Sequence, residues 1–221
     1  NSSPRSVKEL DGLRERIVAA GGRAACFVGD LSDPEARVGL VERITASLGA
    51  VDILVNNAAM ASFKPPSVID LKRVRRMFEL NVFAALDLAQ QALPAMKQRG
   101  WGRIVNISSD SSTQPPMPPP GPAAGVHVLT MYGSSKSALE RMTEGMAQEL
   151  HGTGVHVNAM MPYKIVATEG AADVARQFAA IQPDWLEPIE MMAEATYVLV
   201  AGPYTGLVVS SRQLLQMAQQ P

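Results

Sequence analysis

Short apolar runs alternate with helical patterns along most of this sequence, and that alternation restricts the folds open to the chain. Residues 51–55, 102–107 and 155–160 are apolar runs of strand length, and each follows a segment whose apolar residues recur at helical spacing. Strands that read as continuous apolar runs are typical of parallel sheets with helices on both faces. We therefore predict an α/β fold in which a doubly wound parallel sheet lies between two helical layers, a three-layer αβα arrangement.

The other elements follow from the same periodicities. Helices are predicted over residues 7–20, 34–48, 68–98, 132–150, 171–181 and 187–200, and further strands over residues 23–28 and 206–209. The long helix is expected to break near Leu80 and Asn81. Residues 108–130 are rich in Ser, Pro and Gly and are predicted to form a loop. Since there is no internal repeat and no linker, we expect residues 1–221 to form one domain.

Charge and composition restrict the partners. The formal net charge of −1 gives no electrostatic reason to expect a nucleic acid or an anionic membrane as a partner. No apolar stretch reaches the roughly 20 residues of a membrane span. The three histidines, His127, His151 and His156, lack the spacing of metal ligands. We therefore expect a cytoplasmic protein that acts on a small molecule and needs no metal, nucleic acid or membrane.

Tyr132 and Lys136 lie four residues apart on a predicted helix, so they share a face of it. A phenol normally holds its proton up to about pH 10. An ammonium about 4 Å away, at an effective dielectric near 20, is worth roughly 4 kcal/mol. We therefore expect Lys136 to lower the pKa of Tyr132 by about one to three units, towards the range useful for general acid–base catalysis. Such a pair by itself also occurs on ordinary surface helices.

Polar and small residues follow three of the predicted strands. They are Asp30 and Leu31 after the first strand, Asn56, Asn57, Ala58 and Ala59 after the second, and Ser108 and Ser109 after the third. In open α/β sheets ligands bind at the carboxyl ends of the strands, so these residues lie at the correct edge. Each also has a structural interpretation. The asparagines can cap strand ends, Asn81 can satisfy a kinked helix backbone, and the serines can be turn residues.

Four segments together resemble the motifs of the short-chain dehydrogenase/reductase family, in the same order. They are Asn-Asn-Ala-Ala at 56–59, Glu-Leu-Asn-Val at 79–82, Asn-Ile-Ser-Ser at 106–109 and Tyr-Gly-Ser-Ser-Lys at 132–136. The resemblance covers about residues 23–209. It implies a Rossmann-like fold and an NAD(P)-dependent oxidoreductase that interconverts a secondary alcohol and a ketone by hydride transfer. It also implies a homodimer or homotetramer.

The resemblance implies a role for each motif residue. Tyr132 would be the general acid or base, Lys136 would lower its pKa and hold the nicotinamide ribose, and Ser109 would orient the substrate oxygen. Asn81 would hold a water in a proton relay. The implied cofactor residues are Asp30 at the adenine, Leu31, Asn56, Asn57, Ala58 and Ala59 beside the cofactor, and Ile165 and Thr168 at the carboxamide and phosphate, in addition to Tyr132 and Lys136.

The sequence departs from the family at its beginning. Nothing matches the glycine-rich turn Thr-Gly-x-x-x-Gly-x-Gly, because Gly152-Thr-Gly154 follows a helix and precedes a strand, the reverse of the required context. The resemblance implies two strands before Asn1, in the middle of the sheet. Leaving two inner edges unpaired would be costly. We therefore expect a longer chain of which this sequence is a part, rather than a natural minimal enzyme.

Two local departures concern the active site. The family usually has Gly where Ala59 and Tyr163 stand, so Tyr163 is expected to crowd the nicotinamide or cover the site. The separation between Ser109 and Tyr132 is also longer than the family usually has, and it contains prolines between residues 115 and 122. We interpret these residues as an insertion at the substrate mouth that suits a bulky apolar ketone or alcohol.

Two other functions remain open. A related epimerase or dehydratase for nucleotide sugars shares Tyr-x-x-x-Lys, although the chain after Lys136 leaves little room for a larger substrate domain. A non-catalytic binding or scaffold protein with this fold would agree with the missing glycine-rich turn, but it has no need of a tuned phenol. The choice between NAD and NADP also stays open, because the residue that usually decides it ends the second strand of the family, before Asn1.

Overall fold

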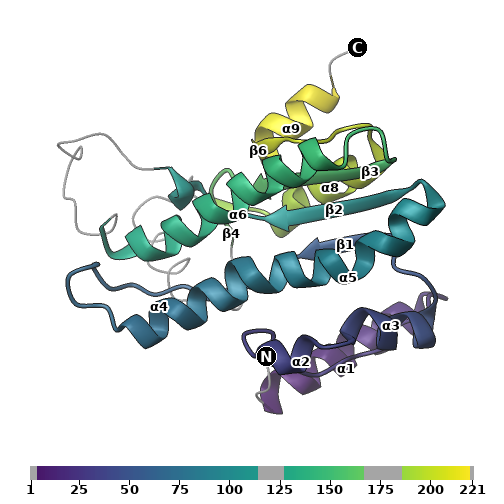
Figure 1. Ribbon diagram of the computed structural model, residues 1–221, viewed down its shortest axis with the longest axis horizontal. Helices are drawn as coiled ribbons and strands as arrows, with labels where there is room; N and C mark the ends of the chain where they lie inside the picture. Colours follow the sequence, from purple (N-terminus) through teal and green to yellow (C-terminus); the bar gives the residue numbers. More distant parts are fainter. Residues whose placement is uncertain (1–3, 114–126, 167–185, 220–221) are drawn as a thin grey trace.

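The main sheet has four parallel strands in the order β1-β2-β3-β6 (Figure 1). They are β1 (Ile53–Asn56), β2 (Gly102–Ile107), β3 (Val155–Met161) and β6 (Val208–Ser210), and a separate parallel pair joins β4 (Ile165–Val166) to β5 (Leu186–Glu187). The computed structural model describes residues 4–113, 127–166 and 186–219. Because parallel neighbours are connected through helices, the topology confirms the predicted α/β fold. None of the helices in the described ranges is both long enough and apolar enough to cross a membrane.

The helices flank the sheet in the order expected from the sequence. They are α1 (Pro4–Ala19), α2 (Pro34–Arg37), α3 (Leu40–Leu48), α4 (Leu71–Phe78), α5 (Ala84–Arg99), α6 (Thr130–Glu149), α8 (Ile189–Ala201) and α9 (Ser211–Ala218), with short 3-10 turns η2 (Asp110–Ser112) and η3 (His127–Leu129). The helix predicted over residues 34–48 is divided into α2, which has Val38 as its C-cap, and α3, whose N-cap Gly39 has a left-handed φ of 62°. The short helix α9 had no counterpart among the predicted elements.

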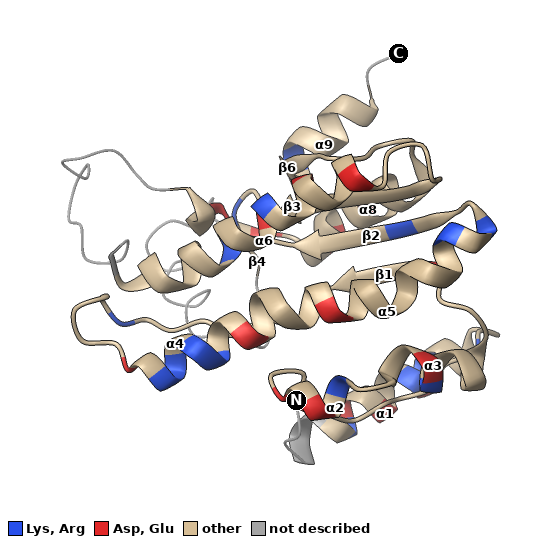
Figure 2. Ribbon diagram, viewed as in Figure 1, with Lys and Arg blue, Asp and Glu red and all other residues tan. Residues whose placement is uncertain are grey.

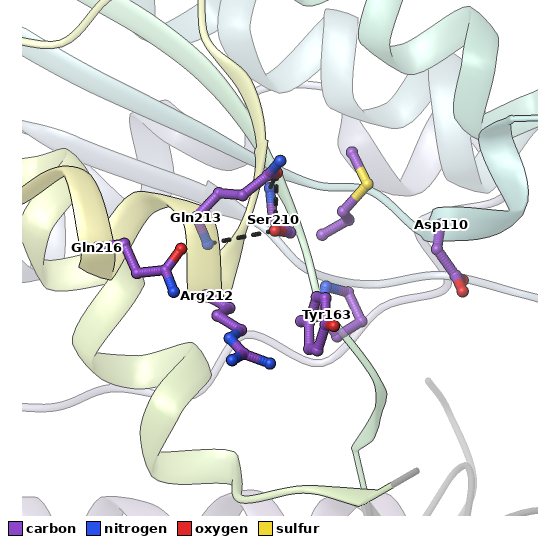
Figure 3. A pocket seen from close by; sticks show the side chains of 8 residues that line it. Asp110, Tyr163, Ser210, Arg212, Gln213 and Gln216 are labelled. Carbon is purple, nitrogen blue, oxygen red and sulfur yellow. Dashed lines mark hydrogen bonds between the residues drawn. The ribbon is translucent and has the colours of Figure 1, made fainter.

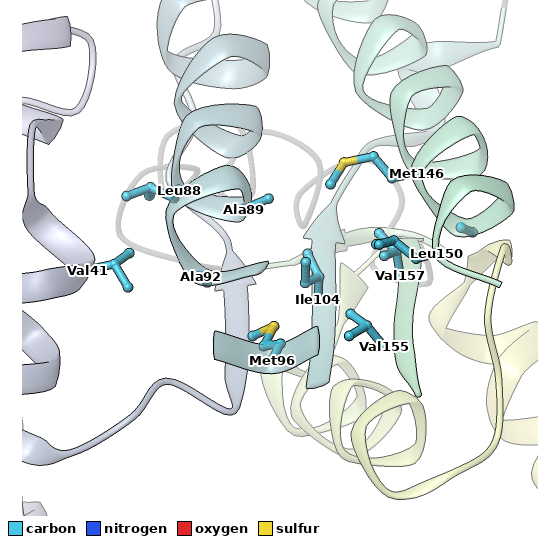
Figure 4. Close-up of a cluster of buried hydrophobic side chains, with 11 residues drawn as sticks. Val41, Leu88, Ala89, Ala92, Met96, Ile104, Met146, Leu150, Val155 and Val157 are labelled. Carbon is cyan, nitrogen blue, oxygen red and sulfur yellow. The ribbon is translucent and has the colours of Figure 1, made fainter. Parts of the chain in front are cut away.

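Two hydrophobic clusters lie on opposite faces of the sheet. On one face α5 and α6 cover residues such as Ile104 and Val157, as Figure 4 shows. On the other face α8 and α9 cover Val105 and Met160. Successive strand residues point to opposite faces, so Ile104 and Val105 fall into different clusters. The arrangement gives three layers, and it places the carboxyl ends of β1, β2 and β3 together at one edge.

The break predicted near Leu80 and Asn81 is a π-helical turn, η1 (Glu79–Phe83), which continues directly into α4 on one side and α5 on the other. Single π turns inside α-helices are frequent at functional sites. Asn81 is buried within it, with 2% of its surface exposed. The irregular turn therefore brings a polar side chain inside the fold, close to the start of α6.

The strand predicted over residues 23–28 is wrong, because these residues form no strand. A strand needs a neighbour to take its backbone hydrogen bonds, and no strand within the described ranges pairs with this segment. The segment is held instead by scattered contacts, such as Cys26 Sγ donating to the Leu10 carbonyl at 3.4 Å. Val28 is 53% exposed. The predicted helix over residues 171–181 and the proline-containing insertion at 115–122 lie outside the described residues.

Candidate active site

The carboxyl end of β2 lies directly against the first half of α6, and this contact assembles the candidate site. Gly133 makes the approach possible, since a Cβ at this position would stand 2.0 Å from the Ser111 carbonyl oxygen. Ser137 Oγ donates to the Ser112 carbonyl at 2.5 Å, one turn further along the helix. The turn η2, which carries Ser109 at its N-cap, is therefore fixed to the helix that carries Tyr132 and Lys136.

Lys136 is a buried cation, with 2% of its surface exposed. Its Nζ donates to the Ile107 carbonyl oxygen at 2.6 Å and lies 5.8 Å from the centroid of the Tyr132 ring. Burial lowers the pKa of Lys136 to about 8, and the negative charge of Glu140 partly opposes that shift. Glu140 is held in turn by Ser108, whose Oγ donates to Glu140 Oε1 at 2.5 Å. Two polar contacts thus bind the end of β2 to α6.

Burial raises the pKa of Tyr132 above its ordinary value. A hydrogen bond with Ser109 acts in the opposite direction, and the charge of Asp110 raises the pKa further. The net lowering of this pKa that the sequence suggested is therefore wrong, because burial is the largest contribution and raises the pKa. The Lys136 ammonium donates its short hydrogen bond to the Ile107 carbonyl. With its pKa raised, the phenol keeps its proton at neutral pH.

Ser109 meets Tyr132, as the sequence predicted, and it is itself well positioned. Its Oγ accepts from the Ser111 backbone N–H at 3.3 Å and from Ser111 Oγ at 3.0 Å, and it lies 3.3 Å from Asp110 Oδ1. These contacts belong to the cap of η2, and they hold the hydroxyl on the same side as the phenol. The structure therefore brings Ser109, Tyr132 and Lys136 together.

Asn81 lies close to Ser109, Tyr132 and Lys136, but its hydrogen bonds go to Met60 and Ser135. Its Nδ2 donates to the Met60 carbonyl at 3.0 Å and to Ser135 Oγ at 2.9 Å, while its Oδ1 accepts from the Met60 N–H at 2.8 Å. Ser135 Oγ donates onward to the Tyr132 carbonyl at 2.6 Å. Both amide protons of Asn81 are therefore used to tie the segment after β1 to α6. The water expected from the family resemblance would have only the second lone pair of Oδ1 available on this side chain.

A cavity of about 80 Å³ lies between the end of β1 and α6, and Lys136 is among its lining residues. Leu31, Asn57, Ala58 and Asn81 line it too. Asn57, Ala58 and Ala59 are exposed, so this edge is open to a ligand. Asn56 instead turns towards the sheet, where its Nδ2 donates to Asn106 Oδ1 at 2.8 Å and Asn106 donates to Thr143 Oγ1 at 2.8 Å.

Asp30 is ionised and already has partners. It accepts from the Ser32 Oγ and N–H at 2.7 and 3.0 Å, and from Arg76 at 2.7 Å. The hydrogen bonds from Ser32 are the main reason that the pKa of Asp30 is lowered, and Arg76 adds to the effect. Arg76 lies on α4, a helix with several basic residues (Figure 2). Of the other predicted cofactor residues, Ile165 lies in β4 and Thr168 lies outside the described residues.

A larger pocket of about 520 Å³ opens at the carboxyl ends of β3 and β6 (Figure 3). Its lining residues are Asp110, Met161, Pro162, Tyr163, Ser210, Arg212, Gln213 and Gln216. The sequence reasoning missed the contribution of α9, although a signal was present. Ser210 followed three residues later by Gln213 is a capping-box pattern, and both reciprocal hydrogen bonds of that box are formed.

Comparison with known proteins identifies related sequences. The family model of the short chain dehydrogenases matches residues 3–178. The chain is 34% identical to a short chain dehydrogenase of Pseudocercospora fijiensis over 193 residues, which cover 86% of this chain and 59% of that protein. It is 36% identical to the L-xylulose reductase of Homo sapiens over 144 residues, which cover 65% of this chain and 53% of that enzyme.

Solved structures show the same likeness. A 3-oxoacyl (acyl-carrier-protein) reductase from Agrobacterium tumefaciens with NADP bound has a TM-score of 0.78 and 28% identity to this chain, and the match covers 90% of this chain and 78% of that one. The chain spans about half the length of the curated relatives it matches. Because the family model covers well over half of the sequence, the chain belongs to the short-chain dehydrogenase family.

Proposed function

We propose that this protein is an NAD(P)-dependent oxidoreductase that interconverts a secondary alcohol and a ketone, with Tyr132 as the general acid or base. The observation that carries the proposal is the buried ammonium of Lys136. It lies between the Ile107 carbonyl and the Tyr132 ring and lines the cavity beside Asn57 and Ala58. A buried cation is costly, and cations of this kind concentrate at functional sites.

The residues at the end of β1 fit one part of the proposed cofactor. Lys136 offers a cation to ribose hydroxyls, and the exposed Asn57 and Ala58 leave room beside it. The cavity of about 80 Å³ is far below the roughly 300–1,000 Å³ of pockets that enclose a drug-sized ligand. It therefore suits the nicotinamide ribose rather than a whole dinucleotide. When bound, the nicotinamide supplies or accepts the hydride.

Side chains of this protein supply the proton that reduction of a ketone requires. In the direction of reduction, the Tyr132 O–H donates its proton to the carbonyl oxygen of the substrate, and Ser109 hydrogen-bonds to Tyr132 and orients the same oxygen. Because burial raises the pKa of Tyr132, the phenol is in the protonated form that reduction requires at neutral pH. Lys136, charged below about pH 8, then stabilises the phenolate that remains. The phenol is therefore in the form that donates a proton to the substrate at neutral pH.

The relatives support a reductase, since those named above include an L-xylulose reductase and an NADP-bound 3-oxoacyl reductase. The choice between NAD and NADP is part of the same test. A homodimer or homotetramer and a cytoplasmic location belong to the proposal as well, on the strength of the family. The scaffold alternative has less support, because a scaffold needs neither a buried Lys136 nor a phenol hydrogen-bonded by Ser109.

The test is oxidation of NADH and NADPH by the purified protein with a panel of ketones, followed by absorbance. Tyr132→Phe removes the proton that general acid catalysis needs and should reduce kcat by about 10²–10⁴-fold. Tyr197→Phe, on α8 and 70% exposed, is the matched control and should retain full activity. Equal activity in Tyr132→Phe would contradict the assigned role. Tight cofactor binding without turnover of any ketone would favour the scaffold.

A further inference from the structure

The pocket at the ends of β3 and β6 adjoins the groups that would react. Asp110, on its rim, follows Ser109 in the chain, and its charge contributes to the raised pKa of Tyr132. The other side of the pocket is formed by Tyr163 after β3 and by the first turns of α9. A substrate whose carbonyl meets Tyr132 therefore extends towards α9.

Hydrogen-bond donors dominate the α9 side of this pocket. Gln213 Oε1 already accepts from the Ser210 N–H at 3.3 Å and from Ser210 Oγ at 2.8 Å, as Figure 3 shows. Because the capping box uses Gln213 Oε1 as an acceptor, the side-chain NH₂ of Gln213 is the part of the amide that a ligand can contact. Arg212 adds guanidinium donors, and Gln216 adds a second amide. A ligand rich in hydrogen-bond acceptors matches these groups.

Arg212 is the cation of the pocket and is held in place by Tyr163. Its guanidinium carbon lies 4.9 Å from the centroid of the Tyr163 ring. Tyr163 is itself fixed through its backbone N–H, which donates to the buried Glu187 at 2.8 Å and to Ser211 Oγ at 3.1 Å. Within residues 4–113, 127–166 and 186–219, no carboxylate forms an ion pair with Arg212. A ring-stacked guanidinium keeps its edge free for a carboxylate in a bidentate pair.

We propose that this pocket binds the carboxylate end of an oxo-acid substrate, with Arg212 as the residue that determines that specificity. The proposal rests on the proposed function and names its substrate class. In Figure 3 Asp110 lies across the pocket from Arg212, so a carboxylate is repelled from the rim near Ser109 and attracted to α9. The charge pattern therefore also orients the substrate, with its carbonyl towards Tyr132 and its acid group away from it. The polar lining points to a different substrate class from the bulky apolar one suggested by the proline-containing insertion, which lies outside the described residues.

The first experiment needs no turnover. Phenylglyoxal modifies exposed arginines, and mass spectrometry of peptides gives the rate at each one. Saturating 4-oxopentanoate should slow the modification of Arg212 about fivefold, the value expected for an exposed ion pair of about 1 kcal/mol. It should leave Arg141, on α6 and 70% exposed, unaffected. The methyl ester of the same acid should protect neither arginine. Absence of protection at Arg212, or equal protection by the ester, would overturn the proposal.

The second experiment uses the activity. The ratio of kcat/KM for 4-oxopentanoate to that for its methyl ester should fall about fivefold in Arg212→Gln, mainly through KM, and should stay unchanged in Arg141→Gln. An unchanged ratio in Arg212→Gln contradicts the specificity role. If the unmodified protein reduces no ketone of the panel with NADH or NADPH, the proposed function fails, while the phenylglyoxal result still decides whether the subsite exists.

Discussion

β1 and β2 are neighbouring parallel strands that both carry an asparagine at their carboxyl ends, yet they differ in burial. Along β2 the first five residues are buried. In β1, Ile53 is 44% exposed and Val55 is 42% exposed, and only the opposite face, at Leu54, packs against the core. The difference arises because β2 has strands on both sides and helices on both faces, whereas β1 is the edge of the sheet.

The same contrast extends to the helices. Leu13, Ile17 and Val18 on α1 are all more than a third exposed, whereas Leu139 on α6 is 1% exposed. The chain thus has a tightly packed region (β2, β3 and α6), called the catalytic region because it carries the proposed residues Tyr132 and Lys136, and a more exposed region (α1, residues 23–31 and β1). Local stability follows buried contacts, so the groups proposed to move the proton lie in the more rigid region. The comparison can be tested by matched changes in the two regions.

The largest expected difference comes from truncating one isoleucine in each strand. Ile104→Ala in β2 removes a side chain that is 1% exposed and should lower the free energy of unfolding by roughly 2–5 kcal/mol. Ile53→Ala in β1 should cost less than about 1 kcal/mol, because much of that side chain already contacts water. Urea unfolding of both variants measures the difference. Equal losses would mean that β1 is as well packed as β2 and would remove the basis of the comparison.

Lys136 should make the stability of the folded protein depend on pH. Burial lowers its pKa to about 8, whereas the unfolded chain holds the proton to about pH 10.4. Between these values the unfolded chain binds more protons than the folded protein, so stability rises with pH. The difference in unfolding free energy between the unmodified protein and Lys136→Met should therefore increase by roughly 3 kcal/mol from pH 7 to pH 10.5.

Urea unfolding at several pH values checks this prediction. The matched control is Lys97→Met, whose side chain is 44% exposed, and the change with pH should be larger for Lys136→Met than for this control. A flat difference for Lys136→Met would mean that the ammonium is solvated. Water would then reach the centre of the catalytic region.

The smallest expected changes in stability come from two helical glycines, and they have opposite signs. Gly133→Ala places a Cβ 2.0 Å from the Ser111 carbonyl, so α6 and η2 must separate, at a cost of about 1–3 kcal/mol. Gly12→Ala in α1 meets open space and should stabilise the protein by about 0.5–1 kcal/mol, since alanine favours helices. Thermal unfolding of both variants checks the two signs. Destabilisation by Gly12→Ala would show that α1 is packed more closely than its exposure indicates.

The sequence allowed good prediction of the catalytic region, where periodicity and packing agree. The strands β2 and β3 and the helix α6 lie where their apolar patterns placed them, and Ser109 meets Tyr132 as expected. The strand at residues 23–28 failed because strand formation depends on a partner that a local pattern does not reveal. The apolar pattern of these residues was typical of a strand, but no strand in the described ranges pairs with their backbone N–H and C=O groups.

The hydrogen bond of Lys136 could not be predicted from the sequence for a different reason. A spacing of four residues places Lys136 on the same face as Tyr132, but it does not decide which acceptor the flexible ammonium chooses. The ammonium donates to the Ile107 carbonyl at the end of β2, and only the packing of strand against helix reveals this contact. The role of Arg212 was missed for a similar reason, since α9 meets Tyr163 only through the tertiary fold.

The hydrogen bond between Asn56 and Asn106 has a consequence for the alignment of the sheet. The two residues stand opposite each other in the register of β1 and β2. A slip of one residue in one direction would bring Asn57, whose side chain also has an N–H donor, to that position. A slip in the other direction would bring Val55 there and leave the Asn106 side-chain Oδ1, on a residue that is 1% exposed, without its donor. Such a loss costs about 1–3 kcal/mol. The hydrogen bond thus opposes a slip of this strand in the direction of Val55, and it helps to hold Asn57 and Ala58 where they line the cavity.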